Sequence, residues 1–111
     1  HSKYAGEKLI TELLPVLDTL DAALAAEKNK SQREGLAMLQ KQLAGVLEKN
    51  GLAPISAHGT AFDPYYHEAV LKEKSEKPEG TVIGEILRGY TLNGKVLRHT
   101  KVKISGGIEN G

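Results

Sequence analysis

The strongest folding signal in this chain is the run Gly89-Tyr90-Thr91-Leu92-Asn93-Gly94-Lys95-Val96-Leu97-Arg98. Apolar, β-compatible segments flank Asn93-Gly94, and this pattern predicts a tight hairpin. A type I′ turn requires positive φ at both central residues, and Asn and Gly tolerate that conformation best. Lys95 and Arg98 then place positive charge at and near the hairpin tip. That charge favours a solvated edge strand guarded by cations, and the alternative is a binding surface. The hairpin alone does not separate the two.

The composition is that of a small soluble protein. The chain has 111 residues, of which 40% are hydrophobic and 26% charged, so one or two small units with little room for a deep core are expected. Only 5% of the residues are aromatic and none is Trp. We therefore expect a partner chain to supply part of the burial. The net charge of +1 argues against whole-chain attraction to nucleic acid or to an anionic membrane.

Several classes of chemistry and location find no support in the sequence. Cysteine is absent, which excludes disulfides and fits a reducing compartment. No apolar run approaches the ~18–20 residues that span a bilayer, and no signal-peptide pattern is present. We expect no membrane partner and a cytoplasmic location, and a mitochondrial or plastid matrix is also compatible.

Residues 3–27 show a helical pattern. Leucines recur at spacings of four, four, three and four, which places a stripe on one helical face, and these are Leu9, Leu13, Leu17, Leu20 and Leu24. Pro15 lies within the pattern and removes one backbone donor. Because the periodicity continues in phase across Pro15, the sequence predicts one kinked helix rather than two helices.

A second helix is predicted from about residue 31 to Asn50. Ser31-Gln32-Arg33-Glu34 matches a capping box, in which Ser31 and Glu34 bond each other's backbone amides. Gly51 is suited to the left-handed position that follows a helix, which makes it a candidate structural hinge. The apolar face of this helix consists of Leu36, Leu39, Leu43, Val46 and Leu47.

Residues 1–51 thus predict a helical hairpin. A hairpin so rich in leucine is poorly covered by itself, and two copies would close into a four-helix bundle. We therefore expect a homodimer whose interface is formed by the two apolar stripes.

Residues 52–111 predict a small all-β domain. Short strands are expected within 53–57, 70–74, 81–87 and 101–104, in addition to the hairpin, and a flexible tail from about residue 106. The fold class is therefore α+β.

No catalytic, metal or cofactor site emerges. No two of the four histidines are four residues apart, and neither the helical zinc motif nor a phosphate-binding glycine loop is present. His67 next to Glu68 is the best acid–base pair, but a histidine bonded to a turn is the favoured interpretation. We predict that the protein is not an enzyme.

Three motifs resemble the GrpE family, whose members are nucleotide exchange factors, or co-chaperones, of DnaK-type chaperones. They are Leu13-Leu14-Pro15-Val16-Leu17-Asp18-Thr19-Leu20-Asp21, Phe62-Asp63-Pro64 with His67-Glu68-Ala69-Val70, and the hairpin run from Gly89. The resemblance covers residues 3–105. It implies a homodimer with a central four-helix bundle and one β-domain per chain. In the family, a β-domain leans on the ATPase domain of the chaperone and opens its nucleotide cleft, so that ADP leaves.

The resemblance also implies contact residues for the ATPase domain. By motif position these are Phe62 and Pro64 in the loop, Ile86 on a strand and Lys95 at the hairpin. Arg98 is a further candidate, which alternatively pairs with an acid inside the dimer. Phe62 is also the only Phe and a candidate for the β-core, and Pro64 also forms a turn.

The sequence departs from the family pattern in places. Compared with the family, we expect the long N-terminal stalk helix to be absent or truncated and the acidic tail to be absent, and His99 stands where the family more often has proline. The alternative function is a dimeric nucleic-acid or scaffold module that presents Lys95, Arg98, Lys101 and Lys103.

Overall fold

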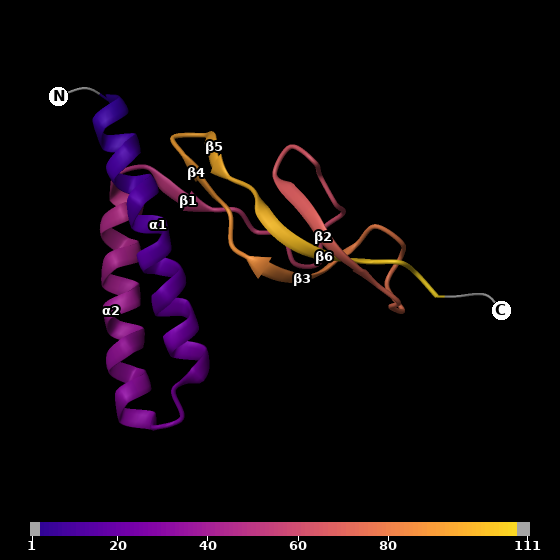
Figure 1. Ribbon diagram of the computed structural model, residues 1–111, viewed down its shortest axis with the longest axis horizontal. Helices are drawn as coiled ribbons and strands as arrows, with labels where there is room; N and C mark the ends of the chain where they lie inside the picture. Colours follow the sequence, from indigo (N-terminus) through magenta and orange to yellow (C-terminus); the bar gives the residue numbers. More distant parts are fainter. Residues whose placement is uncertain (1–2, 109–111) are drawn as a thin grey trace. The chain divides into compact units, whose positions relative to one another are not determined.

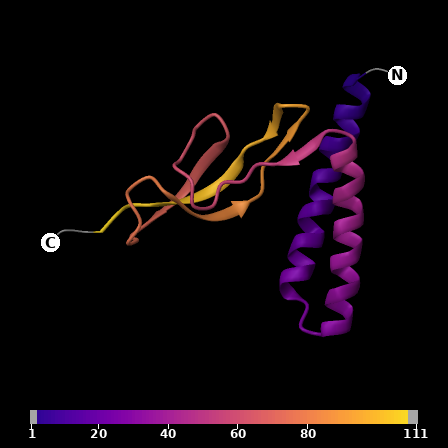
Figure 2. The same cartoon turned by 180° about the vertical axis from the view of Figure 1, so that it is seen from behind.

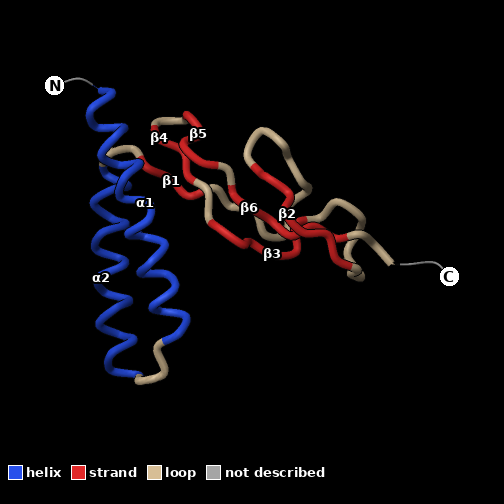
Figure 3. The backbone as a smooth tube through the Cα atoms, viewed as in Figure 1, coloured by secondary structure: helices blue, strands red, loops and turns tan. Residues whose placement is uncertain are grey.

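The computed structural model describes residues 3–108, and the chain divides after Leu52 into two compact units. Two helices precede six strands (Figure 1), as the colouring by secondary structure in Figure 3 also shows. This arrangement confirms the α+β class.

The first unit is a helical hairpin. Helix α1 comprises Lys3–Ala26 and helix α2 comprises Lys30–Lys49, and they lie side by side in both Figure 1 and Figure 2. Pro15 lies inside α1, so the prediction of one helix across this proline is confirmed. Neither helix in residues 3–108 carries an apolar stretch long enough to cross a bilayer.

The predicted capping box at Ser31 is wrong. Helix α2 begins at Lys30, and its N-cap is Asn29, whose side-chain oxygen accepts a hydrogen bond from the amide of Gln32 at 3.0 Å. Asn caps helices at least as well as Ser, and here it stands two residues earlier in the chain. Ser31 and Glu34 consequently lie within the helix, where neither has a capping role.

The end of α2 agrees with the prediction. The helix stops at Lys49 with Asn50 as C-cap, and the amide of Gly51 donates to the carbonyl of Glu48 at 3.0 Å. Gly51 has φ +98°, a conformation that glycine adopts without the steric cost of a Cβ. The sequence-predicted positive φ at this exit is confirmed.

The strands form two three-stranded sheets, with order β1-β4-β5 in one and β2-β6-β3 in the other. Strand β2 runs parallel to β6, whereas β3 and β6 are antiparallel. The first strand is shorter than predicted and ends at Pro54, which lacks a backbone donor, and β2 begins three residues earlier than expected. The strands are β1 Leu52–Pro54, β2 His67–Glu73, β3 Val82–Leu87, β4 Tyr90–Leu92, β5 Lys95–Arg98 and β6 Thr100–Ser105.

The core of the β unit is small. Ala57, Val82 and Val102 are fully buried, and Phe62 and Ile104 pack against them. Along β6, Thr100 and Val102 are buried whereas Lys101 between them is exposed, and Lys103 and Ile104 are intermediate. Further buried side chains of this unit lie outside that cluster, and these are Ile55, His67, Tyr90, Thr100 and Ser105.

The predicted flexible tail starts with two bonded glycines. The amide of Gly106 donates to the carbonyl of Glu73 at 2.8 Å, and the amide of Gly107 donates to Oγ of Ser105 at 3.0 Å. Residues 109–111 of that predicted tail lie outside the described residues.

Candidate partner-binding site

The hairpin tip has the geometry that its sequence predicts. Asn93 has φ +50° and Gly94 has φ +88°, the two positive angles of a type I′ turn. Leu92 and Lys95 face each other across the turn in the antiparallel pair of β4 and β5. Lys95 is therefore the first residue after the turn, and its side chain is exposed.

The loop before β2 is folded around Asp63. Its carboxylate accepts a hydrogen bond from the amide of Tyr65 at 2.9 Å, and its own amide donates to Nδ1 of His67 at 2.9 Å. His67 is only 6% exposed. The interpretation of His67 as a structural histidine bonded to a turn is thus confirmed, because Nδ1 is occupied by a backbone donor.

Phe62 and Pro64 differ in burial. Phe62 is half-buried, packs against the β-core and lies with its ring centroid 5.9 Å from that of His67. It therefore serves as a core anchor, and any partner contact involves only its exposed part. Pro64 is exposed in the turn that follows Asp63.

Ile86 is an exposed apolar side chain on a strand. It lies on β3 and is 51% exposed, although isoleucine is usually buried. The pairing of β3 with β6 shifts register between Glu85 and Leu87, next to Ile86.

Arg98 bonds within its own domain. Its guanidinium donates through Nε, at 2.9 Å, and through Nη2 to the carbonyl of Arg88. The guanidinium carbon also lies 5.6 Å from the ring centroid of Tyr90, within cation–π range. Arg98 thus fastens the end of β5 to the residue that follows β3.

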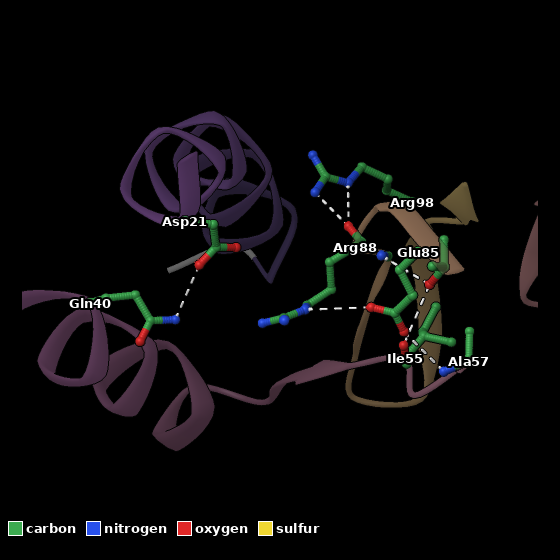
Figure 4. Close-up of polar contacts among 9 residues, drawn as sticks. Asp21, Gln40, Ile55, Ala57, Glu85, Arg88 and Arg98 are labelled. Atoms are coloured by element: carbon green, nitrogen blue, oxygen red, sulfur yellow. Dashed lines mark hydrogen bonds and ion pairs between the residues drawn. The ribbon is translucent and has the colours of Figure 1, made fainter. Parts of the chain in front are cut away.

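Segments that link the two sheets meet beside Arg98 (Figure 4). The amide of Ile55 donates to the carbonyl of Gly89 at 2.9 Å, and the amide of Gly89 donates to Oγ1 of Thr100 at 3.0 Å. The amide of Ala57 donates to Oε1 of Glu85 at 3.1 Å. We call Ile55, Ala57, Glu85, Gly89 and Thr100 the polar junction.

The basic residues of β6 have acidic neighbours. Nζ of Lys103 lies 2.9 Å from a carboxylate oxygen of Glu73, and Lys101 is paired in register with Glu68. Interleaved charges of opposite sign weaken the attraction for a polyanion. Among residues 3–108, no group of three or more His, Asp or Glu side chains gathers where a metal ion would bind.

Comparison with known proteins decides the family. Residues 1–106 match the family model of GrpE. The chain belongs to the GrpE family. The match covers both units and includes every residue considered above as a partner contact.

Curated relatives named "Protein GrpE" align with most of this GrpE-family chain. The relative from Methanosphaera stadtmanae is 40% identical over 103 residues, which are 92% of the chain and 60% of the relative. The relative from Thermoplasma acidophilum is 48% identical over 100 residues, or 90% of the chain and 54% of the relative. The relative from Parasynechococcus marenigrum is 47% identical over 105 residues, which are 88% of the chain and 48% of the relative. The chain therefore spans about half to three-fifths of these relatives.

The predicted dimer-interface residues of this GrpE-family chain fall into three groups. Leu17 and Leu47 are buried in the single chain, whereas Leu9, Leu39 and Val46 are more than half exposed. The intermediate group consists of Leu13, Leu20, Leu24, Leu36 and Leu43. The buried face of the helical hairpin also includes Ile10 and Leu14.

A hydrogen bond joins the two helices: Nε2 of Gln40 donates to Oδ1 of Asp21 at 3.4 Å (Figure 4). This contact joins side chains of α2 and α1. Neither it nor the polar junction has a local sequence signal, because Gln40 and Asp21 are 19 residues apart and Ala57 and Glu85 are 28 residues apart.

Proposed function

We propose that this GrpE-family chain is a homodimeric co-chaperone that exchanges the adenine nucleotide of a DnaK-type chaperone. It binds the ATPase domain of the chaperone and stabilises the form with an open cleft, so that ADP leaves. The observation that carries this proposal is the family match over residues 1–106. No bond is made or broken by the exchange factor, and the protein is accordingly not an enzyme.

The proposed action is a shift of population. A factor that binds open and closed forms equally well shifts nothing, however tightly it binds. Moving a cleft from 1% open to 99% open requires about 10⁴-fold tighter binding to the open form, or about 5.5 kcal/mol. The contact face must therefore discriminate between two shapes of its partner.

The proposed contact face comprises Phe62, Pro64, Ile86, Lys95 and Arg98. Ile86 supports the proposal because an isoleucine that is 51% exposed gains free energy when a partner covers it. Lys95 adds an exposed cation, which favours an acidic partner surface. Arg98 contributes through its fastening of β5, and Phe62 through its exposed part.

The proposed homodimer is supported by apolar side chains of the two helices that are exposed to solvent in the single chain. Leu9 is 59% exposed, Leu39 51% and Val46 52%. A second hairpin packed against these residues would form a four-helix bundle and bury them. Gly51 would then determine the direction in which the chain leaves the bundle.

The decisive experiment measures release of a fluorescent ADP analogue from a DnaK-type chaperone. We expect the wild-type protein to accelerate this release and light scattering to show a dimer. Lys95→Glu should raise the concentration needed for half-maximal acceleration, because it places a carboxylate against an acidic surface. Lys77→Glu is the matched control, since Lys77 is an exposed loop residue and the change in net charge is the same.

Two results would contradict the proposal. If a folded wild-type dimer leaves ADP release unchanged, the exchange function is wrong. If Lys95→Glu and Lys77→Glu behave alike, Lys95 is only a solvated turn residue. Steeply salt-dependent binding of an oligonucleotide by the same protein would instead favour a nucleic-acid module.

A further inference from the structure

The residues of the proposed contact face are divided between two sheets. Lys95 and Arg98 lie on β5, in the sheet β1-β4-β5, whereas Ile86 lies on β3, in the sheet β2-β6-β3. Strands β1 and β4 have only three residues each. A two-stranded hairpin is marginally stable by itself, and β1 adds only three residues to it, so we expect the hairpin to depend on how it is fastened to the second sheet.

The polar junction provides this fastening. Thr100 is fully buried at the start of β6. Its hydroxyl accepts a hydrogen bond from the amide of Gly89 at 3.0 Å and donates one to the carbonyl of Ile55 at 3.4 Å. A hydroxyl is suited to this place because it accepts and donates at once. One side chain thereby links the segments that follow β1, precede β4 and begin β6.

Glu85 provides a second clamp at the same place. Oε1 accepts the amide proton of Ala57 at 3.1 Å, and Oε2 lies 4.0 Å from Nε of Arg88. Ala57 is fully buried, so loss of the carboxylate leaves its amide without this partner. Such a loss is costly for a group away from water.

Gly89 allows the segments to approach this closely. A Cβ at position 89 would overlap the backbone of Thr100 and Arg98. The two connections between the sheets thus pack backbone against backbone, close enough for hydrogen bonds to join them directly.

We propose that Thr100 and Glu85 are positioning residues for nucleotide exchange, which hold the hairpin rigidly against the sheet β2-β6-β3. This inference rests on the proposed function. The physical reason is that the contact face discriminates between an open and a closed cleft only while its parts on the two sheets, Ile86 and Lys95, keep a fixed spacing. If the polar junction is flexible, both parts of the contact face can also contact the closed form, and the difference in affinity between the two forms falls.

The inference predicts a specific kinetic signature. Thr100→Val and Glu85→Ala should lower the maximal rate of ADP release at saturating exchange factor by about two- to tenfold, the factor that one lost hydrogen bond corresponds to. The half-saturating concentration should change less than the maximal rate, because the contact side chains remain. Thr100→Ser and Glu85→Gln keep an acceptor oxygen and should restore most of the rate.

A second measurement uses the free protein. Hydrogen exchange of the hairpin amides, such as those of Thr91 and Val96, should become about two- to tenfold faster in Thr100→Val and Glu85→Ala, whereas the amide of Val102 in β6 should stay protected. If Thr100→Val fails to fold, Glu85→Ala still provides the test, because the Glu85 side chain is 24% exposed whereas Thr100 is fully buried.

The outcomes are distinguishable. If the wild-type dimer does not accelerate ADP release, the proposed function fails, and the hairpin exchange rates still report whether the junction is a clamp. If the wild-type protein is active and the maximal rates of Thr100→Val and Glu85→Ala are unchanged, only the positioning role is overturned. A rise in half-saturating concentration at an unchanged maximal rate would likewise overturn it and make the junction part of the binding surface.

Discussion

Replacement of Gly51 by alanine tests the backbone conformation at the exit of α2. Gly51 has φ +98°, and its amide bonds the carbonyl of Glu48 at 3.0 Å. An alanine must either adopt this conformation, at about 1–2 kcal/mol, or redirect the chain where it enters β1. Alanine also lowers the conformational entropy of the unfolded chain, which stabilises the folded state by a few tenths of a kcal/mol to about 1 kcal/mol. We expect a net destabilisation of about 1 kcal/mol.

Gly35 offers a matched control for the same substitution. It lies inside α2, and a Cβ built on it meets nothing within 4 Å. Gly35→Ala should therefore stabilise the helical unit by about 0.5–1 kcal/mol, because glycine is a poor residue for a helix interior. Together the two variants should differ by roughly 1.5–2 kcal/mol in opposite directions from the wild type.

The assay is thermal unfolding followed by circular dichroism at a fixed protein concentration, since a dimer melts in a concentration-dependent way. At about 4–8 °C per kcal/mol for a domain of this size, the two variants should melt roughly 6–16 °C apart. If Gly51→Ala melts at or above the wild-type temperature, as Gly35→Ala should, the positive φ at Gly51 does not restrain the helix exit and its role as a structural hinge loses its basis.

Other predictions follow from local contacts. Asn29→Ala should destabilise the helical unit by about 0.5–2 kcal/mol, measured by urea unfolding, whereas Ser31→Ala should have little effect; equal effects would contradict the assignment of Asn29 as N-cap. Gly89→Ala should abolish the native NMR spectrum of the β unit, because the new methyl group overlaps backbone. Gly84→Ala should preserve that spectrum, since its Cβ would lie 3.8 Å from the nearest atoms of Lys103, and loss of the fold in this control would refute the steric argument.

Short-range patterns predicted several elements correctly. The hairpin turn at Asn93-Gly94 and the helix exit at Gly51 follow from backbone preferences of single residues, and these preferences act within a few residues of the chain. His67 was interpreted correctly for the same reason, since its partner Asp63 is only four residues away. The family resemblance, based on three short motifs, was confirmed by the match over residues 1–106.

The start of α2 shows where local patterns are ambiguous. Asn29 and Ser31 are both good caps, and sequence alone does not rank them. In the structure the side chain of Asn29 reaches the amide of Gln32, and its own amide donates to the carboxylate of Glu27 at 3.0 Å. Because Asn29 is hydrogen-bonded to residues on both sides of it, Asn29 rather than Ser31 is the N-cap of α2.

The amino-acid sequence by itself determined the elements, the turn residues and the family, because each depends on interactions between near neighbours or on a recognisable motif. Only the tertiary structure placed Phe62 against the core and gathered Glu85, Gly89 and Thr100 at one joint. Those contacts join residues as far as 28 and 45 positions apart, and their partners are chosen by the packing of two sheets. The hairpin can therefore be predicted from ten residues, but how rigidly it is held depends on long-range contacts that exist only in the folded chain.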